Sequence, residues 1–594
     1  MHWTPKRTLQ ETDAIICAAG NPHEMETSLV NGRLYRVYKN LWPSLRQFWI
    51  HCATAYSKNT YIVFEGDRYT YEYIFSRSIK AAHLFSKVYG IQKGDRVGIC
   101  SRNCPDYLVA FWACHLLGAV SVLANAWLPL DPLRYCLEHT ECQLIILDPE
   151  RANLLEPVVG EIAEKAGTQG FLVFDTLDGK GFWKQMRCFN NMVDDLDRDV
   201  SWTMEDTPAI QPEDNATIMF TSGTTGLPKG VLSTQRMFLT NLRNISVGVL
   251  RAKLRQGESL PDPKQGAQQG VLVAVPLFHV TGSTSLSMLA TMNGQKVVLM
   301  RKWIVEEGKR VMLIKKENIS VGGGVPTMVS DLTESSLVGH PLDALIFGGA
   351  SAPSTLPSKA RRSFPTAIMS QTYGMTETNS ISVACAGNDY LARPSSTGLP
   401  APVNDVMIVH NDTVVPVGQR GEVWLRGPNV MKEYWREPAA TAKALTTDGW
   451  LRTGDLGSVD EEGFLYIHDR LKDIIIRGGE NISSVSVEDA IYDDPRVLEA
   501  AAVGIPDSRL GELVAVVVST KAPFYGQVTE EQLLALAKSK LPRFAVPVMI
   551  LVQDRPLDHT PSEKITKGEL RKLAQRAWEA RQQRGITGTV SHRL

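Results

Sequence analysis

A loop rich in glycine and hydroxyl side chains follows a short apolar run, Ala216 to Phe220. The loop, Thr221 to Gly230, contains three glycines, four hydroxyl residues and one lysine. Glycines allow successive backbone N–H groups to point into one concavity, hydroxyls add donors, and the lysine adds positive charge. We therefore expect a nucleoside triphosphate site, although such residues taken alone are also typical of a surface turn. The residues expected to contact the phosphates are Thr221, Ser222, Gly223, Thr224, Thr225, Gly226 and Lys229.

The spacing of this loop argues against simple ATP hydrolysis. The usual loop of kinases and ATPases is Gly-x-x-x-x-Gly-Lys-Ser/Thr, whereas here Pro228 precedes Lys229 and Gly230 follows it. Elsewhere, Thr376 offers a hydroxyl to a phosphate oxygen and Glu377 offers a hard carboxylate to Mg²⁺. Asp455 could accept hydrogen bonds from both ribose hydroxyls, although an isolated Thr-Gly-Asp favours a surface turn.

Length and composition indicate a multidomain globular protein. The chain has 594 residues, 43% of them hydrophobic and 21% charged, and its formal net charge of -1 gives no reason to expect nucleic acid as a partner. Nine scattered cysteines fit neither a zinc site nor a disulfide framework, which indicates a reducing compartment. We expect a cytoplasmic protein. The last residues, 591–594, are a weak peroxisomal alternative because His592 stands where a small residue is usual.

No segment reaches the roughly 18 to 20 uninterrupted apolar residues of a membrane span. The nearest candidate, Tyr107 to Leu128, contains polar residues and is better explained as a buried helix running into a strand. Short β-rich runs elsewhere are separated by helical segments such as Tyr71 to Tyr89 and Pro132 to Thr140, which indicates α/β architecture with parallel strands. The β-rich runs are Arg96 to Cys100, Leu144 to Asp148, Thr217 to Phe220, Val271 to Val275, Val297 to Met300 and Leu345 to Phe347.

After about residue 400 the pattern changes to polar, hairpin-like β sequence, for example Asp405 to His410 and Gly421 to Arg426. We place Asp455 in a polar loop and interpret Asp469 to Asp473 as a charged break between two apolar runs. A smaller α+β unit follows, with a helix from Glu530 to Lys540. We predict two domains, 1–470 and 471–594.

Five segments together resemble the ATP-dependent adenylate-forming family, which includes acyl-CoA synthetases, firefly luciferase and the adenylation domains of peptide synthetases. The resemblance extends from about Lys58 to Leu573. It implies a large N-terminal domain of stacked α/β subdomains plus a β-rich subdomain, with a small mobile α+β C-terminal domain. The five segments are Thr221 to Gly230, Gly348 to Pro353, Gln371 to Glu377, Gly449 to Asp455, and Asp469 to Asp473 running into Gly478 to Asn481.

The resemblance also implies site residues and a two-step reaction. Thr376, Glu377, His279 and Lys564 would be catalytic, Glu377 also binding Mg²⁺, and Tyr373 would lie against the adenine. The family usually has glycine before this lysine, whereas this chain has Glu563, so altered or lost adenylation is an alternative and Lys567 is a fallback donor. The remaining nucleotide residues would be Gly349, Ala350, Ser351, Gln371, Thr372, Gly374, Met375, Asp455 and Arg470.

In the second step, the resemblance implies a rotation about Lys472 that admits a thiol past Gly478, Gly479, Glu480 and Asn481. The acid pocket would be formed by His279, Gly282, Ser283, Val325, Pro326, Gly348 and Tyr373. No acidic residue stands between Pro276 and Ser283 to pair with an α-ammonium group, so we expect a fatty or aromatic acid, with a slight preference for an aliphatic one. For Tyr373, Met375 and His279, a role in core packing is the alternative.

We therefore expect an acid–thiol ligase that uses ATP, Mg²⁺ and coenzyme A. Three alternatives stay open: loading of a free-standing carrier protein, oxygenation of the adenylate as in luciferase, and a catalytically impaired acyl- or nucleotide-binding homologue. The sequence does not predict the oligomeric state.

Overall fold

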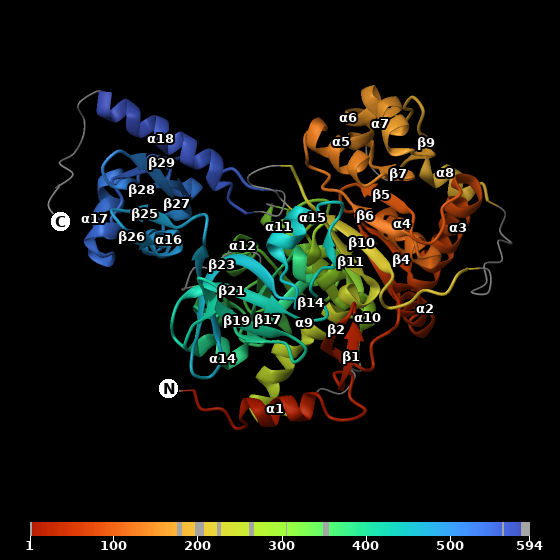
Figure 1. The fold of residues 1–594 in the computed structure, drawn as a ribbon, viewed down its shortest axis with the longest axis horizontal. Coiled ribbons are helices and arrows are strands. Elements are labelled where there is room, and N and C mark those ends of the chain that lie inside the picture. Colours follow the sequence, from red (N-terminus) through yellow and green to blue (C-terminus); the bar gives the residue numbers. More distant parts are fainter. Residues whose placement is uncertain are drawn as a thin grey trace. The chain divides into compact units, whose positions relative to one another are not determined.

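The computed structural model describes residues 3–174, 181–196, 207–221, 227–260, 267–304, 306–348, 356–560 and 564–583. The chain divides into two compact units. Among the described residues, the first unit comprises those up to residue 348 and residues 357–406 and 425–452. The second unit comprises residue 356, residues 407–424 and those from 453 onward. The expected mixed α/β fold is confirmed (Figure 1). The boundary between residues 470 and 471 stays a prediction.

The first unit contains an eight-stranded sheet in the order β22-β11-β10-β6-β5-β7-β8-β9. Its strands are β5 (Arg96–Cys100), β6 (Val120–Leu123), β7 (Leu144–Leu147), β8 (Gly170–Val173), β9 (Arg187–Cys188), β10 (Asn215–Phe220), β11 (Gly230–Thr234) and β22 (Glu433–Tyr434). From β10 to β9 neighbouring strands are parallel. Helix α3 (Tyr71–Tyr89) packs on α4 (Pro105–Leu117), every residue of which is buried before the chain enters β6. The expectation of a buried helix and strand between Tyr107 and Leu128 is therefore confirmed.

A nine-stranded sheet in the same unit has the order β18-β17-β16-β15-β14-β12-β13-β3-β4. Its strands are β3 (Thr60–Phe64), β4 (Asp67–Thr70), β12 (Gly270–Val273), β13 (Lys296–Leu299), β14 (Ile319–Gly324), β15 (Ala344–Gly348), β16 (Ile368–Met375), β17 (Ser380–Ala386) and β18 (Leu399–Pro400). Strands β16, β15, β14 and β12 are parallel neighbours, so their carboxyl ends meet at one edge. Helices α9 (Gln235–Arg255) and α12 (Pro326–Thr333) pack against this sheet.

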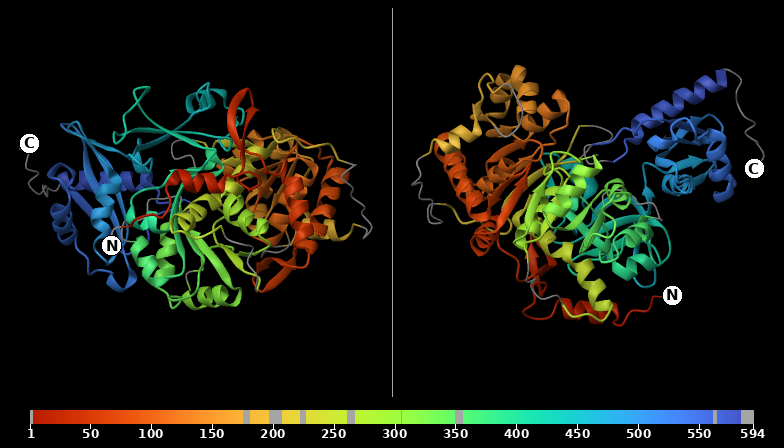
Figure 2. Two further views of the ribbon diagram at one scale, coloured as in Figure 1. Left: turned by 90° about the horizontal axis from the view of Figure 1, so that it is seen from below. Right: turned by 180° about the vertical axis from the view of Figure 1, so that it is seen from behind.

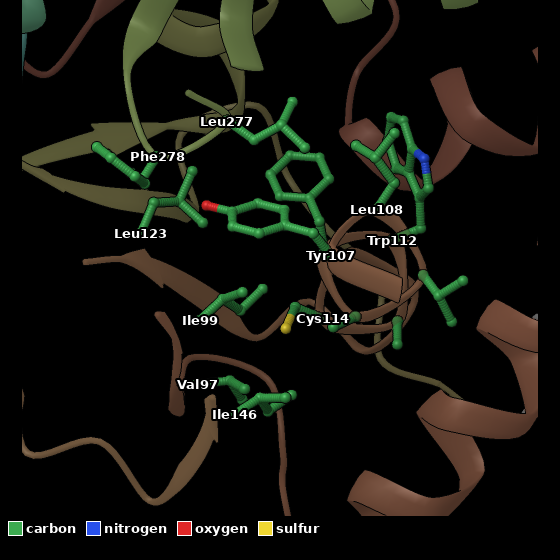
Figure 3. Packing of buried hydrophobic residues seen from close by; sticks show 14 of the residues in the cluster. Val97, Ile99, Tyr107, Leu108, Trp112, Cys114, Leu123, Ile146, Leu277 and Phe278 are labelled. Carbon is green, nitrogen blue, oxygen red and sulfur yellow. The ribbon is translucent and has the colours of Figure 1, made fainter. Parts of the chain in front are cut away.

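One apolar core joins these two sheets. Figure 3 shows Tyr107 and Trp112 of α4 in the same cluster as Leu123 of β6 and the turn residues Leu277 and Phe278. All five are buried. The turn that carries Leu277 follows β12, so burying it fixes the backbone that leads to His279.

A buried asparagine also holds this turn. The Asn103 side chain accepts a hydrogen bond from Leu277 N at 2.8 Å and donates to the carbonyls of Val275 and Met300, each at 3.0 Å. Because Asn103 is only 2% exposed, these bonds form away from solvent and define one conformation of the turn.

A five-stranded sheet, β20-β19-β21-β23-β24, corrects two expectations. Its strands are β19 (Asp405–His410), β20 (Thr413–Val414), β21 (Gly421–Arg426), β23 (Leu451–Val459) and β24 (Leu465–Arg470). The prediction of a polar loop around Asp455 is wrong because Asp455 lies inside β23. The predicted charged break from Asp469 to Asp473 is shorter than expected, because Asp469 and Arg470 still belong to β24 and the turn covers residues 471–473. In both strands, pairing and side-chain hydrogen bonds satisfy polar residues that are typical of loops.

The second unit ends in another sheet, in which β26, β25, β28 and β27 follow one another and β29 pairs with β28. Its strands are β25 (Ile475–Arg477), β26 (Glu480–Ile482), β27 (Val497–Asp507), β28 (Gly511–Thr520) and β29 (Met549–Gln553), and its helices are α16 (Ser484–Tyr492), α17 (Glu530–Lys540) and α18 (Lys567–Gln583). The two faces of β28 belong to two cores, one with α16 and α17 and the other with α18. Figure 2 shows α18 lying along this sheet.

Candidate functional site

The described ends of the predicted phosphate loop are drawn together by strand pairing. Strands β10 and β11 are antiparallel, with Phe220 opposite Gly230, and Thr221 N donates to Lys229 O at 3.0 Å. Lys229, the residue immediately before β11, therefore lies directly beside Thr221. Residues 222–226, which include the expected phosphate-binding residues Ser222, Gly223, Thr224, Thr225 and Gly226, lie outside the described residues.

A tyrosine that sequence analysis missed joins this loop to the predicted metal-binding carboxylate. The Tyr434 hydroxyl donates to Glu377 Oε1 at 2.7 Å, and Lys229 Nζ lies 5.1 Å from the centroid of the Tyr434 ring. Burial and the neighbouring Glu377 charge raise the pKa of Tyr434, so its phenol remains a donor. No local pattern identifies this residue, because the hydrogen bond joins positions 57 residues apart.

The turn that carries Thr376 and Glu377 has an unusual backbone held by buried amides. After β16, a short 3-10 turn covers Thr376–Thr378, and φ is 51° at Asn379 and 95° at Ser380. Asn429 Nδ2 donates to Thr378 O at 2.8 Å, and Asn379 Nδ2 donates to Asn429 O at 3.0 Å. These bonds stabilise positive φ values that most residues avoid.

Steric crowding explains why position 374, a residue of the predicted motif, is glycine. A Cβ on Gly374 would lie 1.5 Å from the carbonyl oxygen of Ser380, so any side chain there would displace the turn. Its neighbours Gln371 and Thr372 form hydrogen bonds with a helix residue and a strand residue, respectively. The Thr372 hydroxyl donates to Phe347 O at 3.1 Å, and Gln371 Oε1 accepts from the Tyr390 hydroxyl at 3.4 Å.

The structure brings the predicted acid-pocket segments to the edge that carries Tyr373, Met375 and Glu377. His279 follows β12, Val325 and Pro326 follow β14, and Gly348 ends β15. Because β12, β14, β15 and β16 are neighbouring parallel strands, residues from four distant stretches lie at adjacent strand ends. Residues 349–355, which include Gly349, Ala350 and Ser351, lie outside the described residues.

His279 lies two residues before a π-helical segment, Thr281–Ser287. Its carbonyl accepts from Gly282 N, Ser283 N and the Ser283 hydroxyl, each at 3.0 Å. A Cβ on Gly282 would lie 2.2 Å from Pro276 O, so glycine is required for this close approach. π-Helical turns are frequent at functional sites, which agrees with the expected position of this segment beside the acid.

Asp455 and Arg470 lie opposite each other on β23 and β24. Arg470 Nε is 3.2 Å from Asp455 Oδ1, and the side chains are 47% and 5% exposed, respectively. The carboxylate is thus buried beside a half-exposed guanidinium, an arrangement suited to accepting hydrogen bonds from a diol.

Lys564 is joined to Thr560 by two hydrogen bonds, one of them to the Thr560 side chain. Thr560 N donates to Lys564 O at 2.6 Å, Lys564 N donates to the Thr560 hydroxyl at 3.2 Å, and His559 pairs with Ile565 as an isolated β-bridge. His559 Nε2 also lies 2.7 Å from the buried Glu499 carboxylate. Glu563 lies outside the described residues, so its effect on Lys564 stays a prediction.

The suggestion that Lys567 could replace Lys564 is disfavoured. Lys567 Nζ is 2.7 Å from Glu488 Oε1 and donates to the Ser484 hydroxyl at 2.6 Å. Desolvation lowers the pKa of Lys567, but attraction to Glu488 and Asp469 outweighs it and raises that pKa overall. This ammonium is already occupied in holding the start of α18.

The predicted hinge and thiol-passage residues occupy exposed turns. Lys472 lies in the turn after β24, where Asp473 N donates to Arg470 O at 2.9 Å. Gly478 and Gly479 form the two-residue connection between β25 and β26, with φ of 60° and 89°. Both values are left-handed, as a tight hairpin with the twist of its strands requires, and glycine adopts them without strain. Glu480 and Asn481 begin β26 and are exposed.

The donor set suits a Mg²⁺ ion that arrives with a nucleotide. Among the described residues, no group of three or more His, Cys, Asp or Glu side chains could hold a metal ion by itself. Glu377 is a single carboxylate, 7% exposed, with one oxygen bonded to Tyr434. Mg²⁺ is commonly bound through one or two carboxylates, phosphates and water, so these residues fit a Mg²⁺–nucleotide complex.

Comparison with known proteins identifies the family. The model of the AMP-binding enzyme family matches residues 49–435, and that of the AMP-binding enzyme C-terminal domain matches residues 486–564. The chain belongs to this family. It is an adenylate-forming enzyme of the acyl-CoA synthetase type, as the motif resemblance predicts.

Relatives and solved structures match over most of their length. The chain is 30% identical to 2-succinylbenzoate–CoA ligase of Bacillus licheniformis over 88% of this chain and 98% of that protein. It is 31% identical to a long-chain-fatty-acid–CoA ligase of Bacillus subtilis over 83% of this chain and 88% of that protein. The structure of o-succinylbenzoate CoA synthetase from Bacillus subtilis with its acyl-adenylate has a TM-score of 0.73 at 26% identity, covering 89% of this chain and 98% of that one.

None of the nine cysteines, all of which lie in the described part of the chain, forms a disulfide. Within the described part of the chain, no helix combines the length and apolar character needed to cross a bilayer.

Proposed function

We propose that this enzyme activates a hydrophobic carboxylic acid, fatty or aromatic, with ATP and transfers the acyl group to coenzyme A. The observation that carries the proposal is the shared strand edge, where the turn of Thr376 and Glu377 lies beside the segments that begin at His279, Val325 and Gly348. An enzyme that joins an acid to a nucleotide needs both binding segments at one place.

In the first step, a carboxylate oxygen of the acid attacks the α-phosphorus of ATP, and the bond to pyrophosphate breaks. Thr376 binds a phosphate oxygen, Glu377 holds Mg²⁺, and Asp455 with Arg470 binds the ribose. Bound Mg²⁺ supplies charge neutralisation for the phosphates. We assign Lys564 to the negative charge that develops on the carboxylate and phosphate oxygens, because a lysine is a compact point charge on a flexible stem.

In the second step, the sulfur of coenzyme A attacks the acyl carbon and AMP leaves. We propose that the C-terminal domain rotates about Lys472 between the two steps. Gly478 and Gly479 then allow the pantetheine arm to approach the backbone. The exposed turn and the two left-handed glycines support these roles. A carrier-protein thiol is the alternative acceptor, and it would use the same chemistry.

The acid pocket excludes one substrate class on charge grounds. No acidic side chain occurs from Pro276 to Ser283, so an α-ammonium group would be buried there without a partner. The related ligases named above act on 2-succinylbenzoate and on long-chain fatty acids. We therefore propose an acid without an α-amine.

The experiment is acid-dependent exchange of labelled pyrophosphate into ATP, followed by thioester detection with coenzyme A. A panel of fatty acids of graded length, benzoates and cinnamates should contain at least one acid that supports both. Lys564→Ala should abolish most exchange yet spare thioester formation from supplied acyl-AMP, whereas Lys572→Ala, a control in the neighbouring helix, should change neither. Release of ADP, or no exchange with any acid, would reject the proposal.

The position of Glu563 allows a separate check for lost catalysis. If the parent chain is inactive and Glu563→Gly forms acyl-AMP, the chain is a binding homologue whose chemistry has been lost. If both are active, glutamate at this position is compatible with adenylation.

A further inference from the structure

Tyr434 contacts the two charged groups that the nucleotide is expected to use. Its hydroxyl is 2.7 Å from Glu377 Oε1, and its ring lies 5.1 Å from the Lys229 ammonium. The tyrosine is 8% exposed and Glu377 is 7% exposed, so solvent screens their hydrogen bond weakly, whereas Lys229 approaches the ring from the exposed side. One side chain therefore lies between a predicted phosphate ligand and a predicted metal ligand.

The backbone around Tyr434 is bonded to both motifs. In β22, Tyr434 pairs with Val231 of β11, and Trp435 N donates to Gly230 O at 2.7 Å. Three residues before Tyr434, Met431 N donates to Glu377 O, also at 2.7 Å. The segment from Met431 to Trp435 thus forms a bridge whose ends are attached to the phosphate loop and to the metal-site turn.

We propose that Tyr434 is a positioning residue that presents one oxygen of Glu377 to the metal ion and keeps the Lys229 ammonium apart from that carboxylate. The inference rests on the proposed function for the identity of the reaction, and on the contacts above for the role of the tyrosine.

The geometry explains how one residue performs both tasks. A hydrogen bond to Oε1 fixes the rotation of the carboxylate, so that Oε2 would be available to bind the metal ion. The ring attracts the ammonium through its π face, so the lysine does not need the carboxylate as its partner. If Lys229 and Glu377 paired directly, each nucleotide would have to separate them before the phosphates and the metal could bind.

The test measures Mn²⁺ binding to the full-length enzyme with ATP and no acid, by the electron paramagnetic resonance signal of free Mn²⁺. Tyr434→Phe keeps the ring and removes only the hydroxyl. We expect it to weaken Mn²⁺ binding about tenfold, because it removes a hydrogen bond to a charged group. Tyr61→Phe is the matched control, since the Tyr61 hydroxyl is fully buried but bonds Thr291 and Trp112 instead.

A double-mutant cycle shows whether Tyr434 acts through Glu377. In a Glu377→Gln background, Tyr434→Phe should change Mn²⁺ binding less than about twofold, since the group that it orients has lost its charge. Tyr434→Leu, which also removes the ring, should additionally raise the Kd for metal-free ATP, whereas Tyr434→Phe should not. Circular dichroism and Tm of each variant report whether the fold is retained.

The outcomes separate this inference from the proposed function. If Tyr434→Phe binds Mn²⁺ as the parent does, or loses the same tenfold in the Glu377→Gln background, the positioning role is wrong. If Mn²⁺ binding weakens as expected but the parent never exchanges pyrophosphate with any acid, the positioning role stands and the proposed reaction fails.

Discussion

Replacing Lys567 with methionine should loosen the last helix without removing a catalytic group. Lys567 begins α18, and its ammonium is 2.7 Å from Glu488 and 2.6 Å from the Ser484 hydroxyl. The Lys567 and Glu488 side chains are 20% and 13% exposed. Surface pairs contribute about 0–1 kcal/mol, while breaking a buried pair costs about 3–5 kcal/mol. For this partly exposed pair we expect the local free energy of unfolding to fall by about 2–3 kcal/mol.

Hydrogen exchange followed by mass spectrometry measures this change in the intact chain. A loss of that size should speed amide exchange in α18 and α16 by about 30- to 150-fold where exchange follows local opening. Lys572→Met is the matched control in the same helix. Lys572 pairs with Glu569 at 2.8 Å, but the two side chains are 68% and 60% exposed, so exchange should barely change.

A second substitution tests the electrostatic reason. Adding Glu488→Gln to Lys567→Met should restore much of the protection, because no uncompensated buried charge remains. Burial raises the pKa of Glu488, so the folded state of the single variant takes up a proton more readily than the unfolded state does. The deficit of Lys567→Met should therefore shrink as the pH falls from 7 towards 5.

One result would refute this reasoning. If Lys567→Met loses as much pyrophosphate exchange as Lys564→Ala while amide exchange in α18 is unchanged, then Lys567 reaches the substrate and its pair with Glu488 is incidental. We expect instead that thioester formation and adenylation both persist at reduced levels, with faster amide exchange.

Three further predictions concern other contacts. Arg470→Ala should raise the Kd for ATP about three- to fivefold and lower the unfolding free energy by less than about 1 kcal/mol, since the arginine is half-exposed. Equilibrium dialysis measures the Kd, and urea unfolding measures the stability. His279→Ala should raise the KM for the acid while the Kd for AMP, measured by calorimetry, stays unchanged. Burial lowers the pKa of His23 to about 4, so stability should fall by up to about 3 kcal/mol as the pH drops from 6.5 to 4, and His23→Gln should flatten that decline in thermal unfolding.

Local patterns in the sequence were sufficient for many elements and for the candidate motifs. The helices at residues 71–89 and 530–540 follow the expected ranges, because apolar periodicity and capping residues act within a few turns. Asp455 and Arg470, which belong to two separate motifs, are paired in the structure. Polar strands were harder to predict: Asp455 and Asp469 resembled loop residues because the partners that satisfy them, Arg470 and Ser484, lie outside the local motif, for example 15 residues away in the case of Ser484.

Sequence by itself determined the family and the chemical groups available, since those depend on residue types and short spacings. Only the tertiary structure decided which groups share a partner. Tyr434 reaches Lys229 and Glu377 because β22 pairs with β11, and the Lys567 ammonium contacts Glu488 and Ser484 because α16 supplies both residues. Strand register and buried ion pairs arise when remote segments close on each other, and no short stretch of residues encodes that closure alone.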